Sequence, residues 1–177
     1  MQKKYIILIA IVAVLGVFGV TTSFLKSISG TVIDAETGKP VEGTAVLAEW
    51  TRRSGIGDYH TVSVRATNTV TDKEGKFHML GPLHPFVDPP DVTIYKKGYV
   101  AWNNKRIFSD YRHRQKSEDM YQAIKLEHFK KSYSYNRHIG FIGVCSNDAL
   151  ASHKKRKFAE AYEWELDLAR EEVLREE

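Results

Sequence analysis

Hydrophobic residues are concentrated at the start of the chain, where residues 5–20 read YIILIAIVAVLGVFGV. No charged residue lies between Lys4 and Lys26. At about 1.5 Å per residue, a helix over positions 5–25 spans about 30 Å, the thickness of a bilayer's hydrocarbon core. The pattern therefore predicts a signal anchor, a transmembrane helix within residues 1–26. A cleaved secretory signal peptide is the alternative, although the small residues near its end make a poor cleavage site.

The charges that flank this segment predict its orientation. Lys3 and Lys4 precede it, and only Lys26 follows closely. Because positive charge favours the cytoplasmic side, we expect a single pass with the amino terminus in the cytoplasm and the rest of the chain outside. In a bacterium this places the globular part in the periplasm, held at the inner membrane. Cleavage of the segment would instead give a secreted protein.

From residue 28 onward, short runs of alternating apolar and polar residues are separated by turn residues. Such alternation is typical of strands with one buried face, and Val41–Trp50 (VEGTAVLAEW) is expected to be half-buried in this way. The predicted strands are Ser29–Asp34, Val41–Trp50, Thr61–Thr71, Lys76–Leu80, Val92–Lys96, Tyr99–Asn103 and Met120–His128. Together they predict a mainly β fold, a seven-stranded antiparallel β-sandwich of the immunoglobulin-like kind.

Five short motifs follow one another within the predicted sandwich. They are GTVID at 30–34, TGKPV at 37–41, GTAV at 43–46, TDKEGKF at 71–77 and KGY at 97–99. In these motifs and their order, the segment Ile28–Tyr99 resembles the carboxypeptidase regulatory-like domain family of transthyretin-like (prealbumin-like) β-sandwiches. The resemblance implies a sandwich fold and an accessory, non-catalytic role.

The residues that carry this resemblance are expected to be structural. Glycines serve turns, aspartates accept bonds from nearby backbone amides, and aromatic residues fill the core. The family-motif residues are Gly30, Asp34, Gly38, Pro40, Gly43, Asp72, Gly75, Phe77, Gly98 and Tyr99.

The end of the chain has a different periodicity. Phe158, Tyr162, Leu166, Ala169 and Val173 recur three or four residues apart, which predicts an amphipathic helix. Because an isolated helix of this kind is marginal in water, we expect it to dock on its own sandwich or on a partner helix. The expected organisation is an anchor at 1–26, the sandwich at 27–130 with a basic insertion at about 103–119, a linker at 131–147, and the C-terminal amphipathic helix at 148–177.

Positive charge is unevenly distributed. The formal net charge is +4, yet residues 96–137 hold eleven Lys and Arg against four Asp and Glu. Arg106, Arg112 and Arg114 are therefore candidates for contact with an anionic surface, whose source is an anionic lipid, a glycan or a protein. A solvated basic loop is the alternative. Nucleic acid is not expected as a partner of an exported domain.

Catalytic and metal-binding motifs are not evident. The seven histidines lack the spacings of a zinc site, and the single cysteine, Cys145, has no CxxC partner. We accordingly assign no catalytic residue, no cofactor and no metal ligand. The sequence favours a non-catalytic, membrane-anchored binding or scaffolding module of the cell envelope. The alternatives are an accessory subunit of an envelope enzyme or transporter, and a hydrolase with an unrecognised site.

A proline-rich segment interrupts the strand pattern. Residues 81–91 read GPLHPFVDPPD, with four of the chain's five prolines. This composition predicts an extended, non-helical loop that crosses the end of the sandwich. Such a loop is either a recognition edge or a connector between the sheets.

Overall fold

The computed structural model describes residues 27–55, 60–84, 86–114, 123–147, 149 and 152–176. The predicted membrane segment lies outside these residues. None of the helices within them combines the length and the apolar sequence needed to cross a bilayer. The described elements are β1 (Ile28–Asp34), β2 (Ala45–Ser54), β3 (His60–Val70), β4 (Lys76–Met79), β5 (Asp91–Tyr95), β6 (Trp102–Asn103), β7 (Ala123–Leu126), α2 (Tyr135–Cys145), the 3-10 helix η2 (His153–Lys155) and α3 (Arg156–Glu176).

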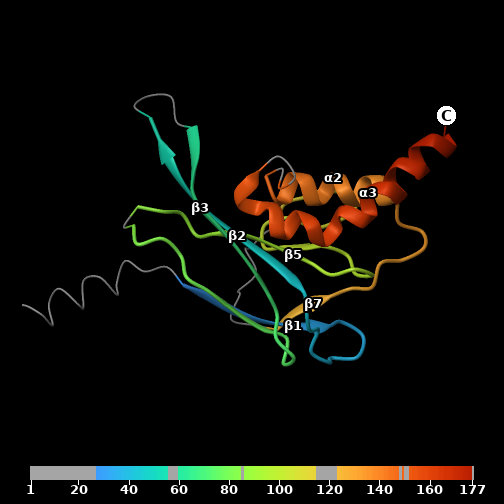
Figure 1. The fold of residues 1–177 in the computed structure, drawn as a ribbon, viewed down its shortest axis with the longest axis horizontal. Helices are drawn as coiled ribbons and strands as arrows, with labels where there is room; N and C mark the ends of the chain where they lie inside the picture. The colour runs from blue at the N-terminus through green and yellow to red at the C-terminus, as the bar shows by residue number, and fades with distance from the viewer. Residues whose placement is uncertain are drawn as a thin grey trace, which may run out of the picture.

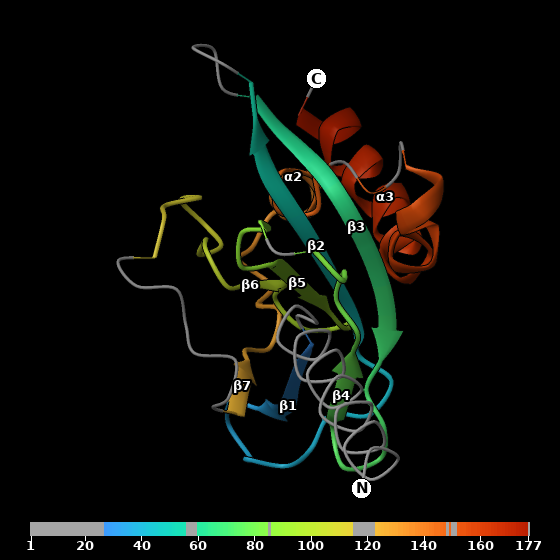
Figure 2. The same ribbon diagram turned by 90° about the vertical axis from the view of Figure 1, so that its left-hand side faces the viewer.

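The strands form two sheets, with the orders β4-β1-β7 and β3-β2-β5-β6. The sheets face each other (Figures 1 and 2). They enclose a core that includes Trp50, Phe77 and Ile94. The prediction of a mainly β sandwich is confirmed. The prediction that it is antiparallel throughout is wrong at one pairing, because β1 and β7 run parallel, with Val32 opposite Ile124. The long connection between these first and last strands permits that direction.

Two helices form a third layer on the outer face of the four-stranded sheet (Figure 1). They bury a second apolar cluster, in which Leu47 and Tyr95 of the sheet meet Phe141 of α2 and Tyr162 of α3. Residues 45–50 of β2 are consequently all buried. The half-buried strand expected from the alternating pattern is therefore wrong, because the helices cover the face that would otherwise meet solvent.

The segment expected to be a linker contains helix α2. The Oγ of Ser134 accepts a hydrogen bond from the Arg137 N–H at 3.1 Å and so caps the helix. The buried residues of α2 are His138, Phe141, Ile142 and Cys145, which share one face. Glycines at 140 and 143 disfavour a helix by propensity, so packing on the sheet stabilises α2 where its sequence does not.

The C-terminal helix begins later than expected. The sequence predicts a helix from about residue 148, whereas α3 begins at Arg156, directly after η2. Its predicted apolar stripe is buried at Phe158, Tyr162 and Ala169. Helix α3 thus packs on the sheet of its own chain, which is the first of the two docking alternatives given above.

Candidate functional site

One residue of the family motifs, Asp34, joins three separated segments. Its Oδ1 accepts hydrogen bonds from the backbone N–H groups of Glu36 and Thr37, at 2.9 and 2.7 Å, and from the Thr37 hydroxyl. Its Oδ2 accepts one from the Tyr99 hydroxyl at 2.9 Å and lies 2.8 Å from Nε2 of His128. The Tyr99 and His128 rings stack, with centroids 4.6 Å apart. This cluster ties β1 to the turn after β5 and to the end of β7.

The ionisation of this cluster does not suit catalysis. The backbone amide of Thr37 and the other donors hold the pKa of Asp34 well below its usual range, so its carboxylate is a poor base. Burial, and then the bond to Asp34, raise the pKa of the Tyr99 hydroxyl, which disfavours a phenolate nucleophile. Asp34 therefore acts as a structural acceptor.

The lowered pKa of Asp34 predicts how stability depends on pH. The folded state binds the Asp34 proton less readily than the unfolded state, so the carboxylate stabilises the fold near neutral pH, and this contribution is lost as the pH falls below about 4. We expect Asp34→Asn to destabilise the protein at pH 7 and to flatten the fall in stability on acidification. Urea unfolding of the full chain between pH 7 and pH 2.5 measures both effects. Asp167→Asn, on the exposed surface of α3, is the control, and equal acid dependence of Asp34→Asn and the unsubstituted chain would contradict the role.

The other family-motif residues lie in turns or in the core. Gly75 shows the clearest constraint: its φ is +71°, and a Cβ there would lie 2.3 Å from the Val32 carbonyl oxygen. Asp72 accepts bonds from the Glu74 and Lys76 amides within the same turn. Gly38, Gly43 and Gly98 lie in turns and have positive φ. Gly30 is a half-buried residue of β1, and Pro40 forms a β-bridge with Ile33 of that strand. The ring of Phe77 is buried in the core between the sheets.

A histidine and a glutamate that the sequence did not single out form a buried pair. Nε2 of His138 accepts the Ala101 N–H at 2.8 Å, so the ring proton resides on Nδ1 and points to Oε1 of Glu165 at 2.5 Å. Oε2 of Glu165 accepts the Tyr95 hydroxyl at 2.7 Å. Both ring nitrogens are thus occupied, and the imidazole is fully buried. The pair joins α2 and α3 to the sheet and has no access to a substrate.

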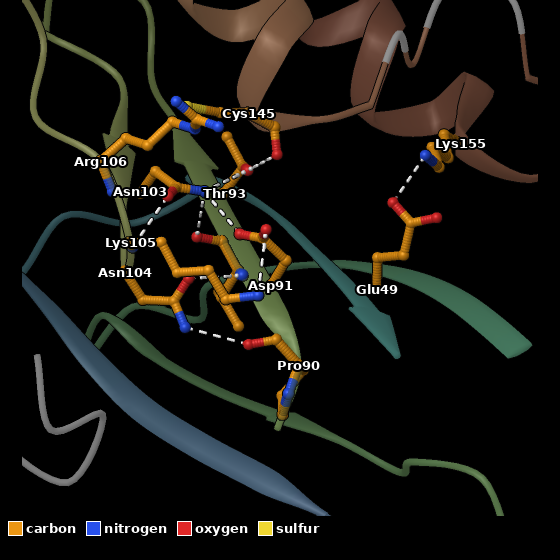
Figure 3. Close-up of polar contacts among 11 residues, drawn as sticks. Glu49, Pro90, Asp91, Thr93, Asn103, Asn104, Lys105, Arg106, Cys145 and Lys155 are labelled. Atoms are coloured by element: carbon orange, nitrogen blue, oxygen red, sulfur yellow. Dashed lines mark hydrogen bonds and ion pairs between the residues drawn. The ribbon is translucent and has the colours of Figure 1, made fainter. Parts of the chain in front are cut away.

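A second buried pair lies nearby, between Glu49 of β2 and Lys155 of η2 (Figure 3). Nζ of Lys155 is 2.7 Å from Oε2 of Glu49 and also donates to the Ser146 and Asn147 carbonyls. Cys145 lies at the same helix–sheet interface, where burial raises the pKa of its thiol to about 12. A thiol with that pKa is not a nucleophile at neutral pH.

Two asparagines at the end of β6 fix the basic insertion to the sheet (Figure 3). Oδ1 of Asn103 accepts the backbone N–H groups of Lys105 and Arg106, while its Nδ2 donates to Asp91 and Thr93. Asn104 bonds the Val92 amide and the Pro90 carbonyl. The sequence signal for this anchor is an Asn-Asn pair that directly follows a strand.

The described part of the basic insertion is a packed hairpin. The backbones of Arg106 and His113 form an isolated antiparallel β-bridge. The Tyr111 hydroxyl donates a hydrogen bond to the Arg137 carbonyl on α2. The ring of Phe108 packs against His138, with centroids 4.9 Å apart. Residues 105–114 thus form a hairpin that packs on α2 at Phe108 and Tyr111 and is exposed at Ser109, Asp110, Arg112 and His113, and residues 115–119 lie outside the described part.

The three candidate arginines have different environments. Arg112 is exposed at the hairpin tip, where its Nε lies 3.4 Å from Asp110. Arg106 is half-buried close to Cys145. Nε of Arg114 donates to the Asn103 carbonyl at 2.9 Å, and its guanidinium lies 5.4 Å from the Trp102 ring centroid. The structure does not gather the three into one site.

Arg114 does line a cavity of about 420 Å³, here called the edge cavity. It lies between β6 and β7, the edge strands of the two sheets. Backbone bonds near residues 98–100 and 127–129 join these edges at one end, and the 105–114 hairpin forms a further wall. The lining residues are Val100, Ala101, Trp102, Ile107, Phe108, Arg114, Ala123, Ile124, Lys125, Glu127 and Tyr133.

The lining of the edge cavity combines apolar and polar surface in similar proportions. Trp102, Ile107 and Phe108 supply rings and an aliphatic surface, and among the described lining residues the charged groups are Arg114, Lys125 and Glu127. Concave sites that pair apolar surface with a few placed polar groups are typical of small-molecule binding. Such a lining can hold an amphipathic anion, with its charge near the two cations and its apolar part against the rings. Within the described residues, no group of His, Cys, Asp and Glu has the arrangement of a metal site.

Comparisons with known proteins leave the family open. No protein-family model matches the chain, and no curated protein matches it. Among solved structures, catechol 1,2-dioxygenase of Acinetobacter radioresistens is similar at 14% identity over 60% of this chain and 53% of that chain, with a TM-score of 0.37. A streptococcal ancillary pilin matches at 12% identity over 60% of this chain and 30% of that one, with a TM-score of 0.30. The shaft pilin SpaA of Lactobacillus rhamnosus GG matches at 20%, over 60% and 48%, also with a TM-score of 0.30. This chain spans about half or less of each, and likenesses this weak carry no inference about its activity.

Proposed function

We propose that this protein is a non-catalytic binding or scaffolding module, held at a cell-envelope membrane by residues 5–25, and that its edge cavity binds an amphipathic anion. We further propose that the sandwich is a carboxypeptidase regulatory-like domain, on the motif residues from Gly30 to Tyr99. The ligand class is a small group, or the end of a larger lipid, glycan or protein, that joins a negative charge to a ring or short apolar chain.

The observation that carries the proposal is the lining of the edge cavity. The Arg114 guanidinium is held in place by the Asn103 carbonyl and the Trp102 ring before any ligand arrives, so little side-chain freedom remains to be lost on binding. Lys125 is exposed on β7 and adds a second cation at the rim. Charge-assisted hydrogen bonds from such groups are the strong ones in recognition of carboxylates and phosphates.

The environment of the groups best suited to acid–base chemistry favours a binding function over a catalytic one. Asp34 and the His138–Glu165 pair are engaged in internal hydrogen bonds that join elements of the fold. None of the three lines the edge cavity. The proposal therefore gives these residues a structural role and leaves recognition to the cavity.

Binding of 2-naphthyl phosphate tests the proposed site, because this probe pairs an anion with an apolar ring system. We expect the full chain in lipid nanodiscs to bind it in isothermal titration calorimetry, and to bind neutral 2-naphthol more weakly. Arg114→Gln is expected to raise the dissociation constant about 10- to 100-fold, since a hydrogen bond to a charged group contributes about 1.5–3 kcal/mol.

The matched control is Arg112→Gln, which removes the same charge from the same hairpin at a residue outside the cavity lining. Lys125→Gln provides a second cavity variant that leaves the Asn103 and Trp102 contacts of Arg114 in place. Equal losses of affinity in Arg112→Gln and in the two cavity variants, or no binding by the unsubstituted chain, would show that the edge cavity is not the site.

A further inference from the structure

Three large apolar side chains are exposed on a single loop, between β4 and β5. Leu80, Leu83 and Phe86 are 50%, 61% and 81% exposed. We call these three residues the apolar tip. The other exposed large apolar residues of the described chain lie apart from it, at Val70 on β3, Val144 on α2, and Val173 and Leu174 at the end of α3. Grouped exposure of this kind is typical of an interaction surface.

The loop is held in place within the tip and directly after it. Gly81 and Pro82 are buried, and Val87 packs against the core between the sheets. The Asp88 N–H donates to the Thr51 carbonyl at 2.8 Å, which fixes the loop to β2. The described backbone beside Leu80, Leu83 and Phe86 is therefore anchored to the sandwich at residues 81, 82, 87 and 88.

The tip also lies beside the point where the predicted membrane segment meets the sandwich. Ile28, the first residue of β1, pairs with Met79, the residue directly before Leu80, and β1 and β4 are neighbours in Figure 2. Paired Cα atoms in antiparallel strands are about 5 Å apart. Position 25, the end of the uncharged segment, lies three positions before Ile28, a separation of at most about 11 Å along the chain. A bilayer that holds residues 5–25 thus lies within reach of the tip.

The charges near the tip match an anionic membrane surface. Arg52 and Arg53 are exposed directly after Thr51, the residue that bonds the loop, and Nη1 of Arg65 lies 3.5 Å from the Gly81 carbonyl. Asp88 is the opposing exposed charge on the loop. Among the charged residues that the structure describes at this loop and at the strands that contact it, the three cations outnumber Asp88, which favours approach to acidic headgroups while the apolar side chains enter the interface.

We infer that Leu80, Leu83 and Phe86 insert into the bilayer interface and orient the sandwich on the membrane, with Arg52, Arg53 and Arg65 facing lipid headgroups. This inference rests on the proposed membrane anchor. It goes beyond that anchor, because a tethered domain without such a contact would tumble freely at the surface.

Depth measurements with spin labels test the insertion. The full chain is reconstituted in phosphatidylcholine–phosphatidylglycerol vesicles (3:1) as Cys145→Ala with one added cysteine, Phe86→Cys or Leu83→Cys, each carrying a nitroxide. Leu174→Cys is the matched control, because Leu174 is 71% exposed at the far end of α3 (Figure 1). We expect the ratio of oxygen to nickel-chelate accessibility to be several-fold higher at positions 86 and 83 than at position 174.

Alkaline carbonate extraction of the same samples separates the two hypotheses. If the protein resists extraction but the accessibility ratios at positions 86 and 83 equal the ratio at position 174, the insertion is overturned and the anchor is retained. Release of the protein by carbonate, with water-exposed labels at all three positions, would overturn both.

Discussion

Replacing His138 with alanine is expected to lower the free energy of unfolding by about 3–5 kcal/mol, because it breaks a buried polar pair and opens a cavity. The change leaves Glu165 without one of its donors and the Ala101 N–H without its acceptor, both in the interior. Phe108 and Phe129 also lose a ring partner. Urea denaturation of the full chain, followed by circular dichroism, measures the loss.

His153→Ala is the control for this substitution. His153 is exposed on η2, and its removal is expected to change stability by less than about 0.5 kcal/mol. Glu165→Gln keeps the shape of the pair and is expected to cost less than His138→Ala. A loss of under about 1 kcal/mol in His138→Ala would show that the network does not join the helices to the sheet as proposed.

Lys155→Met is expected to destabilise the fold by about 3–5 kcal/mol, because it leaves the buried carboxylate of Glu49 without its ion-pair partner. One Glu49 oxygen already lacks a hydrogen-bond partner, so the ion pair with Lys155 is the main compensation for burying this charge. Methionine matches the length of the lysine stem, which limits the loss of packing. Chemical denaturation measures the effect.

The double variant Glu49→Leu/Lys155→Met makes this test specific. Replacing both charges with apolar residues removes the desolvation cost together with the attraction, so we expect it to recover most of the lost stability. Lys157→Met changes an exposed lysine in the same basic run, residues 154–157 (KKRK), and is expected to be close to neutral. A double variant no more stable than Lys155→Met would contradict the assignment of the loss to an unpaired Glu49.

Local sequence patterns predicted much of the sandwich and the C-terminal helix, but not α2, the other helix of the third layer. The turn glycines and alternating residues located β1 and β4 to within a residue or two. In β2 the same alternation predicts only one buried face. The second face is also buried, because Leu47 and Glu49 contact the helical layer, and local periodicity does not predict where those helices pack. The direction of β7 depends on a long connection, and it was predicted wrongly for the same reason.

The candidate site was predictable only in part. An excess of positive charge pointed to Arg114, yet nothing local distinguishes it from Arg112, which remains in solvent. The buried pairs join residues far apart in sequence: Glu49 and Lys155 are 106 positions apart. In sequence, Lys155 cannot be distinguished from its exposed neighbours in the run 154–157. It is buried because η2 directs its side chain toward Glu49. Pairings of this kind arise from tertiary packing, which no short motif records.

The most direct test of the edge cavity as a binding site is the set of intermolecular nuclear Overhauser effects between 2-naphthyl phosphate and the isotope-labelled full chain in nanodiscs. We predict cross-peaks from the naphthyl protons to the Ile107 methyl groups and to the rings of Trp102 and Phe108, with their loss in Arg114→Gln and retention in Arg112→Gln. Cross-peaks confined to other surfaces, or none at a saturating concentration of the probe, would contradict the proposed function.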